Sequence, residues 1–272
     1  GSGPFGTMFR GYHAVTHQSV ALKFLDIPDT PETMDRFNEV GGRLIGAQHD
    51  FLPTLQHYHY DPPYAMLVYD LLTMPSGTAP DLHGYRQQFA SDANGMLPPF
   101  HALKIGHQLA TAVAVLHDAG LCHGGIRPRN VLFEYDRADQ EAWRLRMKLT
   151  DSAIPAFLGP ELYGDWARQA LASRAELKPA AAEAVLFMAP ELHEGAAVSV
   201  AADIYGIAAT TLYALTGADG SSPRKTPGSY REGLDDTWDP VLGKALRSDP
   251  SRRYSSAAEF TEYLECIEAP PE

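Results

Sequence analysis

The pattern of apolar residues changes once along this chain of 272 residues, and the change limits the folds open to it. Short runs at residues 19–25 and 64–70 are typical of β-strands, and a further strand is predicted near residues 54–60. From residue 97 apolar residues recur at helical spacing, and the continuous run 204–215 predicts a buried core helix. Strands followed by helices indicate an α+β protein built from two lobes.

One helix is predicted among the strands. Thr30 can cap its first turn, Pro31 suits the first helical position, and Glu32 places an acid at the positive end of the helix dipole. We expect this helix to end near Gln48, although each glycine within it weakens it by about 1 kcal/mol. Farther along, we expect a hairpin after the long helix that begins near residue 97, and irregular structure over residues 152–188.

Composition excludes several classes of function. The formal net charge of −12 argues against nucleic acid or an anionic membrane as the main partner. No apolar run approaches the roughly 20 residues that a membrane-spanning helix needs. Only two cysteines are present, Cys122 and Cys266, so we expect a reducing compartment, namely the cytoplasm.

A series of motifs then narrows the fold. The chain opens on GSGPFG, a loop whose glycines let backbone amides approach a phosphate, and Lys23 follows on a predicted strand. In a dinucleotide-binding unit the loop would open a helix instead. The segment HGGIRPRNVL at residues 123–132 resembles the catalytic loop of protein kinases, H-R-D-L-K-P-x-N, in unbroken register.

Four more segments resemble kinase motifs in the family's order. KLTDSA at residues 148–153 resembles the strand that leads into D-F-G, and FMAPE at 187–191 retains A-P-E. DIYGI at 203–207, with LTG at 215–217, resembles the family's central helix, and DPSRRY at 249–254 resembles its D-P-x-x-R segment. The chain is therefore identified as a member of the protein kinase superfamily, similar to the bacterial serine/threonine group.

The resemblance implies a domain layout. Residues 1–72 would form a small antiparallel β lobe with one helix and the hinge, and its first strand would be truncated. Residues 73–272 would form a larger, mainly helical lobe. We expect the two lobes to be one kinase-like domain within a longer cytoplasmic protein.

The resemblance also implies a nucleotide site for ATP, with weak binding expected. Lys23 would hold the phosphates and would itself be held by a glutamate, for which Glu39 is the nearest candidate, although the usual spacing points to Val40. Asn130 and Asp151 would bind Mg²⁺ through hard oxygen ligands. The remaining implied contacts are the loop glycines Gly1, Gly3 and Gly6, the adenine contacts Met8, Ala21 and Leu132, the gatekeeper Tyr69, and the hinge residues Asp70 and Leu72.

The catalytic machinery departs from the family at five positions. Gly125 stands where the family has the aspartate that accepts the substrate's proton, a contribution of roughly 10²–10⁴-fold. Arg127 replaces the loop lysine, with a different charge geometry. Gly124 replaces an arginine, Ser152 the phenylalanine of D-F-G, and Ala184 a threonine. These losses predict a pseudokinase that is not an enzyme.

The scaffold positions, by contrast, keep their family residues. Glu191 and Arg253 are expected to form a buried ion pair. Asp203 is expected to accept backbone amides from the loop around His123, and His123 itself is expected to pack in the core. All of these roles are structural.

Three functions stay open. The first is a signalling scaffold or allosteric module that binds protein partners and possibly a nucleotide. The second is a weak or unusual phosphotransferase, and the third is a nucleotidyltransferase on the same fold. We expect neither nucleic acid nor a membrane as a partner of this domain.

Overall fold

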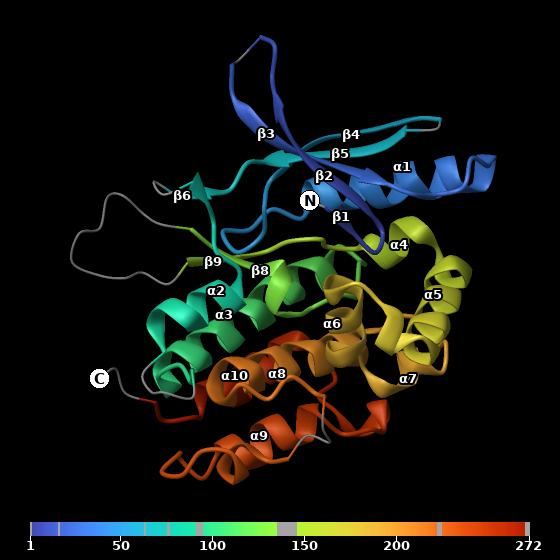
Figure 1. Cartoon of the computed structure of the whole chain (residues 1–272). Coiled ribbons are helices and arrows are strands. Elements are labelled where there is room, and N and C mark those ends of the chain that lie inside the picture. The colour runs from blue at the N-terminus through green and yellow to red at the C-terminus, as the bar shows by residue number, and fades with distance from the viewer. Residues whose placement is uncertain are drawn as a thin grey trace.

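The computed structural model describes residues 2–15, 17–62, 64–74, 77–90, 95–134, 146–221 and 225–269. It has two lobes, a β-rich lobe above and a helical lobe below (Figure 1). The predicted α+β fold is therefore confirmed. Whether the lobes divide at residue 72 remains a prediction.

The small lobe is an antiparallel sheet covered on one side by a helix. Its strands are β1 (Ser2–Gly3), β2 (Gly6–Tyr12), β3 (Ser19–Leu25), β4 (Leu55–Asp61) and β5 (Tyr64–Asp70), in the order β1-β2-β3-β5-β4. On β3, Leu25 is buried, and Lys23 lies two residues from Ala21, on the same face of the strand. The register pairs Lys23 with Met8 on one side and with Leu67 on the other.

Helix α1 (Pro31–Gly46) packs against the sheet. It begins where the sequence predicts, because the Thr30 hydroxyl accepts a hydrogen bond from the Thr33 amide and Pro31 occupies the first turn. It ends two residues before the predicted Gln48. Gly41 lies on its inner face, where a Cβ atom would come within 2.7 Å of the Tyr58 ring. The glycine therefore allows helix and sheet to approach closely.

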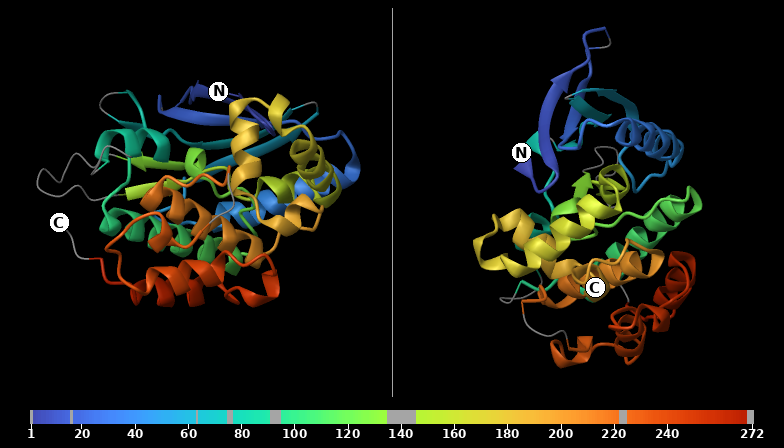
Figure 2. Two further views of the ribbon diagram at one scale, coloured as in Figure 1. Left: turned by 60° about the horizontal axis from the view of Figure 1, so that its bottom comes forward. Right: turned by 90° about the vertical axis from the view of Figure 1, so that its right-hand side faces the viewer.

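The large lobe is built around two long helices, α3 (Pro99–Asp118) and α8 (Val200–Thr216), which pack along each other. Nearly every residue of α8 is buried, as its continuous apolar run predicts. Helices α2 (Leu82–Phe89), α9 (Trp238–Ala245) and α10 (Ala257–Glu265) surround this pair (Figures 1 and 2). No helix in the described ranges has both the length and the apolar character needed to cross a membrane.

Two small elements lie at the junction of the lobes. The expected hairpin consists of β8 (Val131–Glu134) and β9 (Arg146–Leu149), and it follows the short helix η1 (Pro128–Asn130). A two-stranded pair, β6 (Thr73–Met74) with β7 (Gly77–Thr78), precedes α2. The remaining short 3₁₀ segments are η2 (Arg174–Glu176), η3 (Pro227–Ser229) and η4 (Pro250–Arg252).

The prediction of irregular structure over residues 152–188 is wrong. This stretch contains α4 (Ile154–Leu158), α5 (Pro160–Ala172) and α6 (Pro179–Phe187), and α7 (Pro190–His193) follows. Each of these helices has a proline in its first turn, where the missing amide hydrogen costs nothing. Gly159, at a φ of 89°, joins α4 to α5. Proline was therefore a helix-start signal here, not a breaker.

Candidate nucleotide site

The loop of residues 123–130 is held from below by α8. Asp203, in the first turn of α8, accepts hydrogen bonds from the His123 amide at 2.7 Å and from the Gly124 amide at 2.8 Å. The expectation that this carboxylate accepts amides of the loop is confirmed, and the carboxylate is buried. The loop is therefore a rigid support for the groups that line the cleft.

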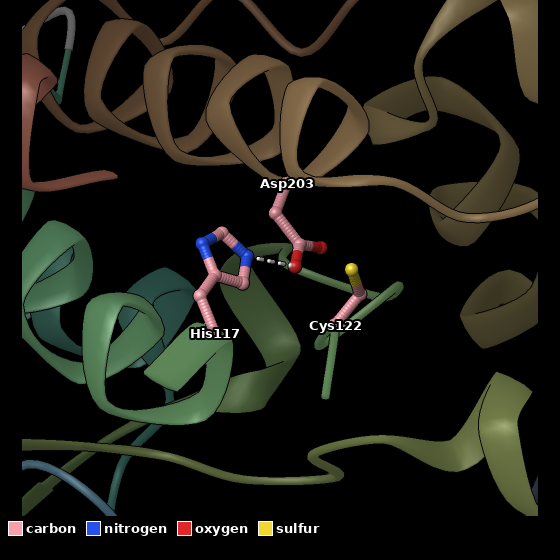
Figure 3. A group of neighbouring side chains, drawn as sticks. All are labelled: His117, Cys122 and Asp203. Carbon is pink, nitrogen blue, oxygen red and sulfur yellow. Dashed lines mark hydrogen bonds and ion pairs between the residues drawn. The ribbon is translucent and has the colours of Figure 1, made fainter. Parts of the chain in front are cut away.

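His117 and Cys122 converge on the same carboxylate (Figure 3). His117 Nε2 lies 3.0 Å from an Asp203 oxygen that also accepts the His123 amide. Burial, with a smaller effect of the Asp203 charge, raises the pKa of the Cys122 thiol to about 12, so this sulfur is protonated at neutral pH. With the carboxylate already engaged by two amides and an imidazole, we interpret the group as a structural tie of the loop and not as a metal centre.

His123 is fully buried, as expected. Its Nε2 lies 3.0 Å from the Thr150 carbonyl oxygen and donates to it, because its Nδ1 accepts the Gly125 amide at 3.1 Å. Burial lowers the pKa of His123 below its ordinary value, even though the Asp203 charge acts in the opposite direction. The ring is neutral and orients the loop without taking part in chemistry.

Gly125 presents no side chain to the cleft, but the space for one is there. A Cβ atom at this position would meet nothing closer than the Asn130 Nδ2 atom at 3.7 Å, which is ordinary van der Waals contact. The backbone does not adopt the positive φ that favours glycine. The Gly125 carbonyl accepts a hydrogen bond from Asn130 Nδ2 at 2.7 Å. The family's aspartate is thus absent from a position that could hold it.

Gly124, its neighbour, is a different case. It has a φ of 72°, and a Cβ atom there would come within 2.5 Å of Pro155 Cγ. Its carbonyl accepts a hydrogen bond from the buried Tyr163 hydroxyl at 2.9 Å. The arginine that kinases carry at this place would not fit against α4, so Gly124 is required by the present packing.

Lys23 forms an ion pair with Asp151. The Nζ to Oδ1 distance is 2.7 Å, and only 4% of the lysine side chain is exposed. Burial raises the pKa of Asp151, but the charge and hydrogen bond of Lys23 outweigh it, and the pKa lies below its ordinary value. The structure thus brings together the predicted phosphate-binding lysine and one predicted metal ligand.

The structure does not bring Glu39 to Lys23, so this predicted contact is wrong. The Glu39 side chain is 61% exposed and pairs with Arg43 at 2.5 Å, one turn along α1. The reason is the position of α4 against α1. Arg36 donates hydrogen bonds to the carbonyls of Phe157 and Leu158, both at 3.1 Å. Helix α4 therefore fills the inner side of α1.

Asn130 and Asp151 remain the residues that could hold Mg²⁺. The Asn130 amide nitrogen is engaged by Gly125, which leaves its carbonyl oxygen as the group suited to a hard cation. The Asp151 oxygen Oδ1, however, is taken by Lys23. The two ligand positions are present, but a metal would have to compete with a buried ammonium for one of them.

Arg127 occupies the space beside Gly125. Its residue exposure is 6%, and it lines a narrow cavity of about 30 Å³ together with Gly125 and Tyr163. Within the described part of the chain its Nε atom has no hydrogen-bond partner. Burial lowers the pKa of Arg127 below its ordinary value, while the charge of Asp151 acts in the opposite direction. An arginine remains protonated in proteins, so this is a buried positive charge.

The predicted adenine contacts lie on facing elements. Ala21 pairs with Tyr69 in the sheet, Met8 lies on the neighbouring strand, and Leu132 lies on β8 below. Tyr69 is buried with an unpartnered hydroxyl, and burial raises its pKa strongly, the charge of Asp151 adding to the effect. The tyrosine thus lies in the sheet opposite Ala21, and its role as a gatekeeper remains a prediction.

The remaining predicted nucleotide contacts lie at the two ends of the cleft. Asp70 ends β5 with an exposed side chain that accepts a hydrogen bond from Gln56 Nε2 at 2.5 Å, and Leu72 follows it. Gly3 and Gly6 form the turn between β1 and β2, where Gly6 has a φ of 140°. Gly1 lies outside the described residues. Their roles as nucleotide contacts remain predictions.

Sequence reasoning missed the cover over the catalytic loop. Phe5, at the tip of the glycine-rich turn, packs edge-on against Trp166 of α5 with ring centroids 4.5 Å apart and lies 5.8 Å from the Tyr163 ring. The same phenylalanine lines the cavity beside Gly125 and Arg127. An aromatic residue among the loop glycines was the available signal. In this arrangement the small lobe closes on the helices that follow Asp151.

Glu183 was also missed. This buried carboxylate on α6 accepts the Arg129 backbone amide at 3.1 Å, and its Oε2 lies 2.6 Å from Arg129 Nε and 3.0 Å from His83 Nε2. These bonds, with its nearby charges, hold the pKa of Glu183 below its ordinary value although burial alone would raise it. Glu183 joins α6 to the catalytic loop, next to Ala184. An acid in an alanine-rich segment was the only signal.

The predicted ion pair between Glu191 and Arg253 is confirmed. It is bidentate, at 2.6 and 2.7 Å, and the arginine side chain is fully buried. The guanidinium also donates to three backbone carbonyls, so each of its nitrogens has a partner. This pair anchors the end of the helical segment to the rest of the large lobe.

Comparison with known proteins agrees with this geometry. The protein kinase domain family matches residues 1–265. The chain belongs to the protein kinase family. The serine/threonine-protein kinase PknH of Mycobacterium tuberculosis is 26% identical over 280 residues, covering 96% of this chain and 39% of PknH. The serine/threonine-protein kinase pkn2 of Myxococcus xanthus is 24% identical over 291 residues, covering 97% of this chain and 31% of that protein. This chain thus spans less than half the length of these relatives.

Solved structures show the same fold. The Mycobacterium tuberculosis PknI kinase domain matches 97% of this chain and 92% of that one, with a TM-score of 0.70 and 21% identity. Rad53 residues 1–466, solved in complex with AMP-PNP, matches 97% of this chain and 63% of that one, with a TM-score of 0.65 and 20% identity. At these identities the likeness concerns the fold alone.

The comparisons correct one prediction, namely that the chain is not an enzyme. Its family is that of the protein kinase domain, and the relatives are named serine/threonine-protein kinases, which points to an enzyme. The prediction weighed the loss at Gly125 too heavily. A general base contributes roughly 10²–10⁴-fold, whereas enzymes accelerate reactions by roughly 10⁶-fold or more, so most of the acceleration has other sources.

Proposed function

We propose that this domain is a slow ATP-dependent phosphotransferase that acts on hydroxyl groups of protein substrates. The observation that carries the proposal is the pair of the buried Lys23 with Asp151. Thr150, which precedes Asp151, donates its amide to the Asn130 carbonyl at 2.8 Å. Binding and positioning groups of the kinase site are therefore present. The substrate class is suggested by the serine/threonine-protein kinases to which the chain is similar.

The reaction needs no side-chain base to balance. The substrate oxygen attacks the terminal phosphorus of ATP, the bond to the ADP oxygen breaks, and the hydroxyl proton passes to solvent. Phosphoryl transfer depends mainly on positioning and on stabilising charge on the phosphate oxygens. Lys23 and Arg127 supply positive charge at that end of the cleft. Without a carboxylate at Gly125 the attacking hydroxyl is poorly oriented, and the transfer is slow.

A signalling role through protein partners belongs to the same proposal, as does a cytoplasmic location. The support is the family alone, since the relatives described above are named serine/threonine-protein kinases. The expected partner surface is that of the kinase-like domain. Nucleotidyl transfer is the alternative outcome of the experiment below, because the same fold could expose a different phosphate to attack.

The test is a transfer assay with radiolabelled ATP and a mixture of serine- and threonine-containing peptides. Label on the terminal phosphate should reach the peptides or the protein itself, and Lys23→Ala should reduce this transfer to background. Transfer of label from the innermost phosphate instead would assign nucleotidyl transfer. No transfer of either label, at protein concentrations in the micromolar range, would contradict the proposal.

A further inference from the structure

The phosphate end of the cleft has an uneven charge balance. Two cationic side chains of the site are buried: Lys23 on β3, with 4% of the residue exposed, and Arg127 on the loop that carries Asn130, with 6% exposed. Arg127 lines the cavity under Phe5 of the glycine-rich turn. Asp151 forms the 2.7 Å ion pair with Lys23, and its charge also acts on Arg127. His123 adds no charge, because burial keeps it neutral. The sum of these side chains is one positive charge.

Arg127 is the unbalanced member. Glu183 also lies close enough to act on it, but that carboxylate already meets Arg129 at 2.6 Å and His83 at 3.0 Å. Arg127 Nε has no partner in the described part of the chain. A buried charge without a full set of partners is unfavourable, and an anionic ligand is the natural way to complete it.

Gly125 also leaves the net charge of the site more positive than the family's aspartate would. An aspartate there would bring the sum of the charged side chains to zero, and the nucleotide's negative charge would then need a divalent cation to offset it. With glycine, the positive charge remains. The absent carboxylate and the buried guanidinium thus have one joint effect, which is a site suited to a polyanion.

A metal ion suits this site less well. To bind Asp151 it must share the carboxylate with Lys23, whose Nζ lies 2.7 Å from Oδ1, and it would meet the positive charges of Lys23 and Arg127, both of which act on this carboxylate. Like charges a few ångströms apart repel strongly where water is excluded. Asn130 could still offer its carbonyl oxygen, but a neutral amide compensates little of that repulsion.

We propose that Lys23 and Arg127 bind the phosphates of a nucleoside triphosphate directly, so that binding does not require a divalent cation. The Arg127 guanidinium takes the place of metal charge and offers planar paired donors to phosphate oxygens. On binding, Lys23 exchanges its contact with Asp151 for one with phosphate. The proposal rests on the nucleotide binding proposed above, and it concerns binding and not the rate of transfer.

The experiment measures the Kd of ATP by calorimetry at fixed ionic strength, once with EDTA and once with millimolar Mg²⁺. We expect the two Kd values to agree within about threefold, or the EDTA value to be the lower. Binding that appears only with Mg²⁺ would overturn the inference and leave the proposed function standing. Absence of binding under both conditions would overturn the inference and the proposed function together.

Two variants separate a guanidinium site from a metal site. Arg127→Met keeps the length and apolar stem of the side chain, and it should weaken ATP binding in EDTA by about tenfold or more, the cost of a charged hydrogen-bonded contact. Asp151→Asn removes the competing carboxylate and should leave binding in EDTA unchanged or tighter. If a metal ion held the phosphates instead, Asp151→Asn would severely weaken ATP binding measured with Mg²⁺. An unchanged Kd for Arg127→Met in EDTA would overturn the inference.

Controls keep the result interpretable. Arg252→Met removes the same charge at a position that is 71% exposed and lies in η4 of the large lobe, and ATP binding should not change. Far-ultraviolet circular dichroism and ligand-free melting show whether each variant is folded. If Arg127→Met does not fold, Arg127→Gln takes its place, because its amide restores polarity without charge and the same tenfold criterion applies.

Discussion

Replacement of Gly125 by aspartate restores the missing carboxylate, and the structure has room for it. The nearest atom to an added Cβ is Asn130 Nδ2 at 3.7 Å, and the backbone conformation is open to any residue. We expect a folded protein with a free energy of unfolding within about 1 kcal/mol of the parent. The stiffer unfolded chain contributes about 0.4–1 kcal/mol in favour of the folded state for such substitutions.

The expected gain in rate follows from what the carboxylate supplies. Orientation and proton transfer contribute roughly 10²–10⁴-fold in a complete site. Here Arg127 would lie beside the new carboxylate and form an ion pair with it, and Glu39 would still face solvent. Both effects place the gain at the lower end, about 10²-fold in initial rate of terminal-phosphate transfer. Full kinase activity is not expected.

The assay compares Gly125→Asp with Gly125→Asn at equal concentration. Asparagine fills the same space but does not take a proton, so the ratio of the two rates isolates the carboxylate. The aspartate variant should also bind ATP more tightly with Mg²⁺ than without. The charges of Lys23, Arg127, Asp151 and the introduced carboxylate then sum to zero. Equal rates for two well-folded variants would refute the reasoning, since the absent carboxylate would then not be the deficit that limits transfer.

Three further predictions concern stability. Gly124→Ala should lower the free energy of unfolding by about 1–3 kcal/mol in urea, because the residue has a φ of 72° and its Cβ would meet Pro155 Cγ at 2.5 Å; an unchanged midpoint would contradict the assigned backbone. Glu191→Gln should cost about 3 kcal/mol, because it leaves the buried Arg253 charge uncompensated, and a loss under 1 kcal/mol would speak against that burial. Because the pKa of His123 is lower in the folded than in the unfolded state, the unfolded chain binds more protons below about pH 6.5. Stability should therefore fall as the pH drops from 7 to 5, and His123→Gln should flatten that part of the curve measured by urea unfolding.

The sequence predicted those features that depend on local signals or on fixed family geometry. The start of α1 follows from Thr30 and Pro31, whose roles do not depend on distant contacts. The pair of Glu191 with Arg253 and the amides held by Asp203 follow from motifs that fix their own surroundings. These residues are buried, and few alternative arrangements could satisfy their charges.

The sequence could not predict features that depend on how one element docks on another. Glu39 was assigned to Lys23 by spacing along the chain, but the face that α1 turns to the cleft is set by Arg36 and by α4. The burial of Arg127 depends on α5 and α6, in a stretch that was expected to be irregular. A one-residue uncertainty on a helix is a rotation of about 100°, which is enough to exchange cleft for solvent.

The position of α1 and the Lys23–Asp151 pair belong to one arrangement. With α4 against α1, no glutamate of that helix reaches Lys23, and Asp151 becomes the anion that satisfies the buried ammonium. A nucleotide that takes Lys23 frees Asp151, whose remaining partner in the cleft is the charge of Arg127. Lys23 thus has two alternative partners, Asp151 without nucleotide and phosphate with it. A nucleotide shifts the equilibrium between these two states only by the difference in its affinity for them. Because that difference comes from Lys23 and Arg127, the residues that bind phosphate are also those through which binding could reach α4 and the cover formed by Phe5.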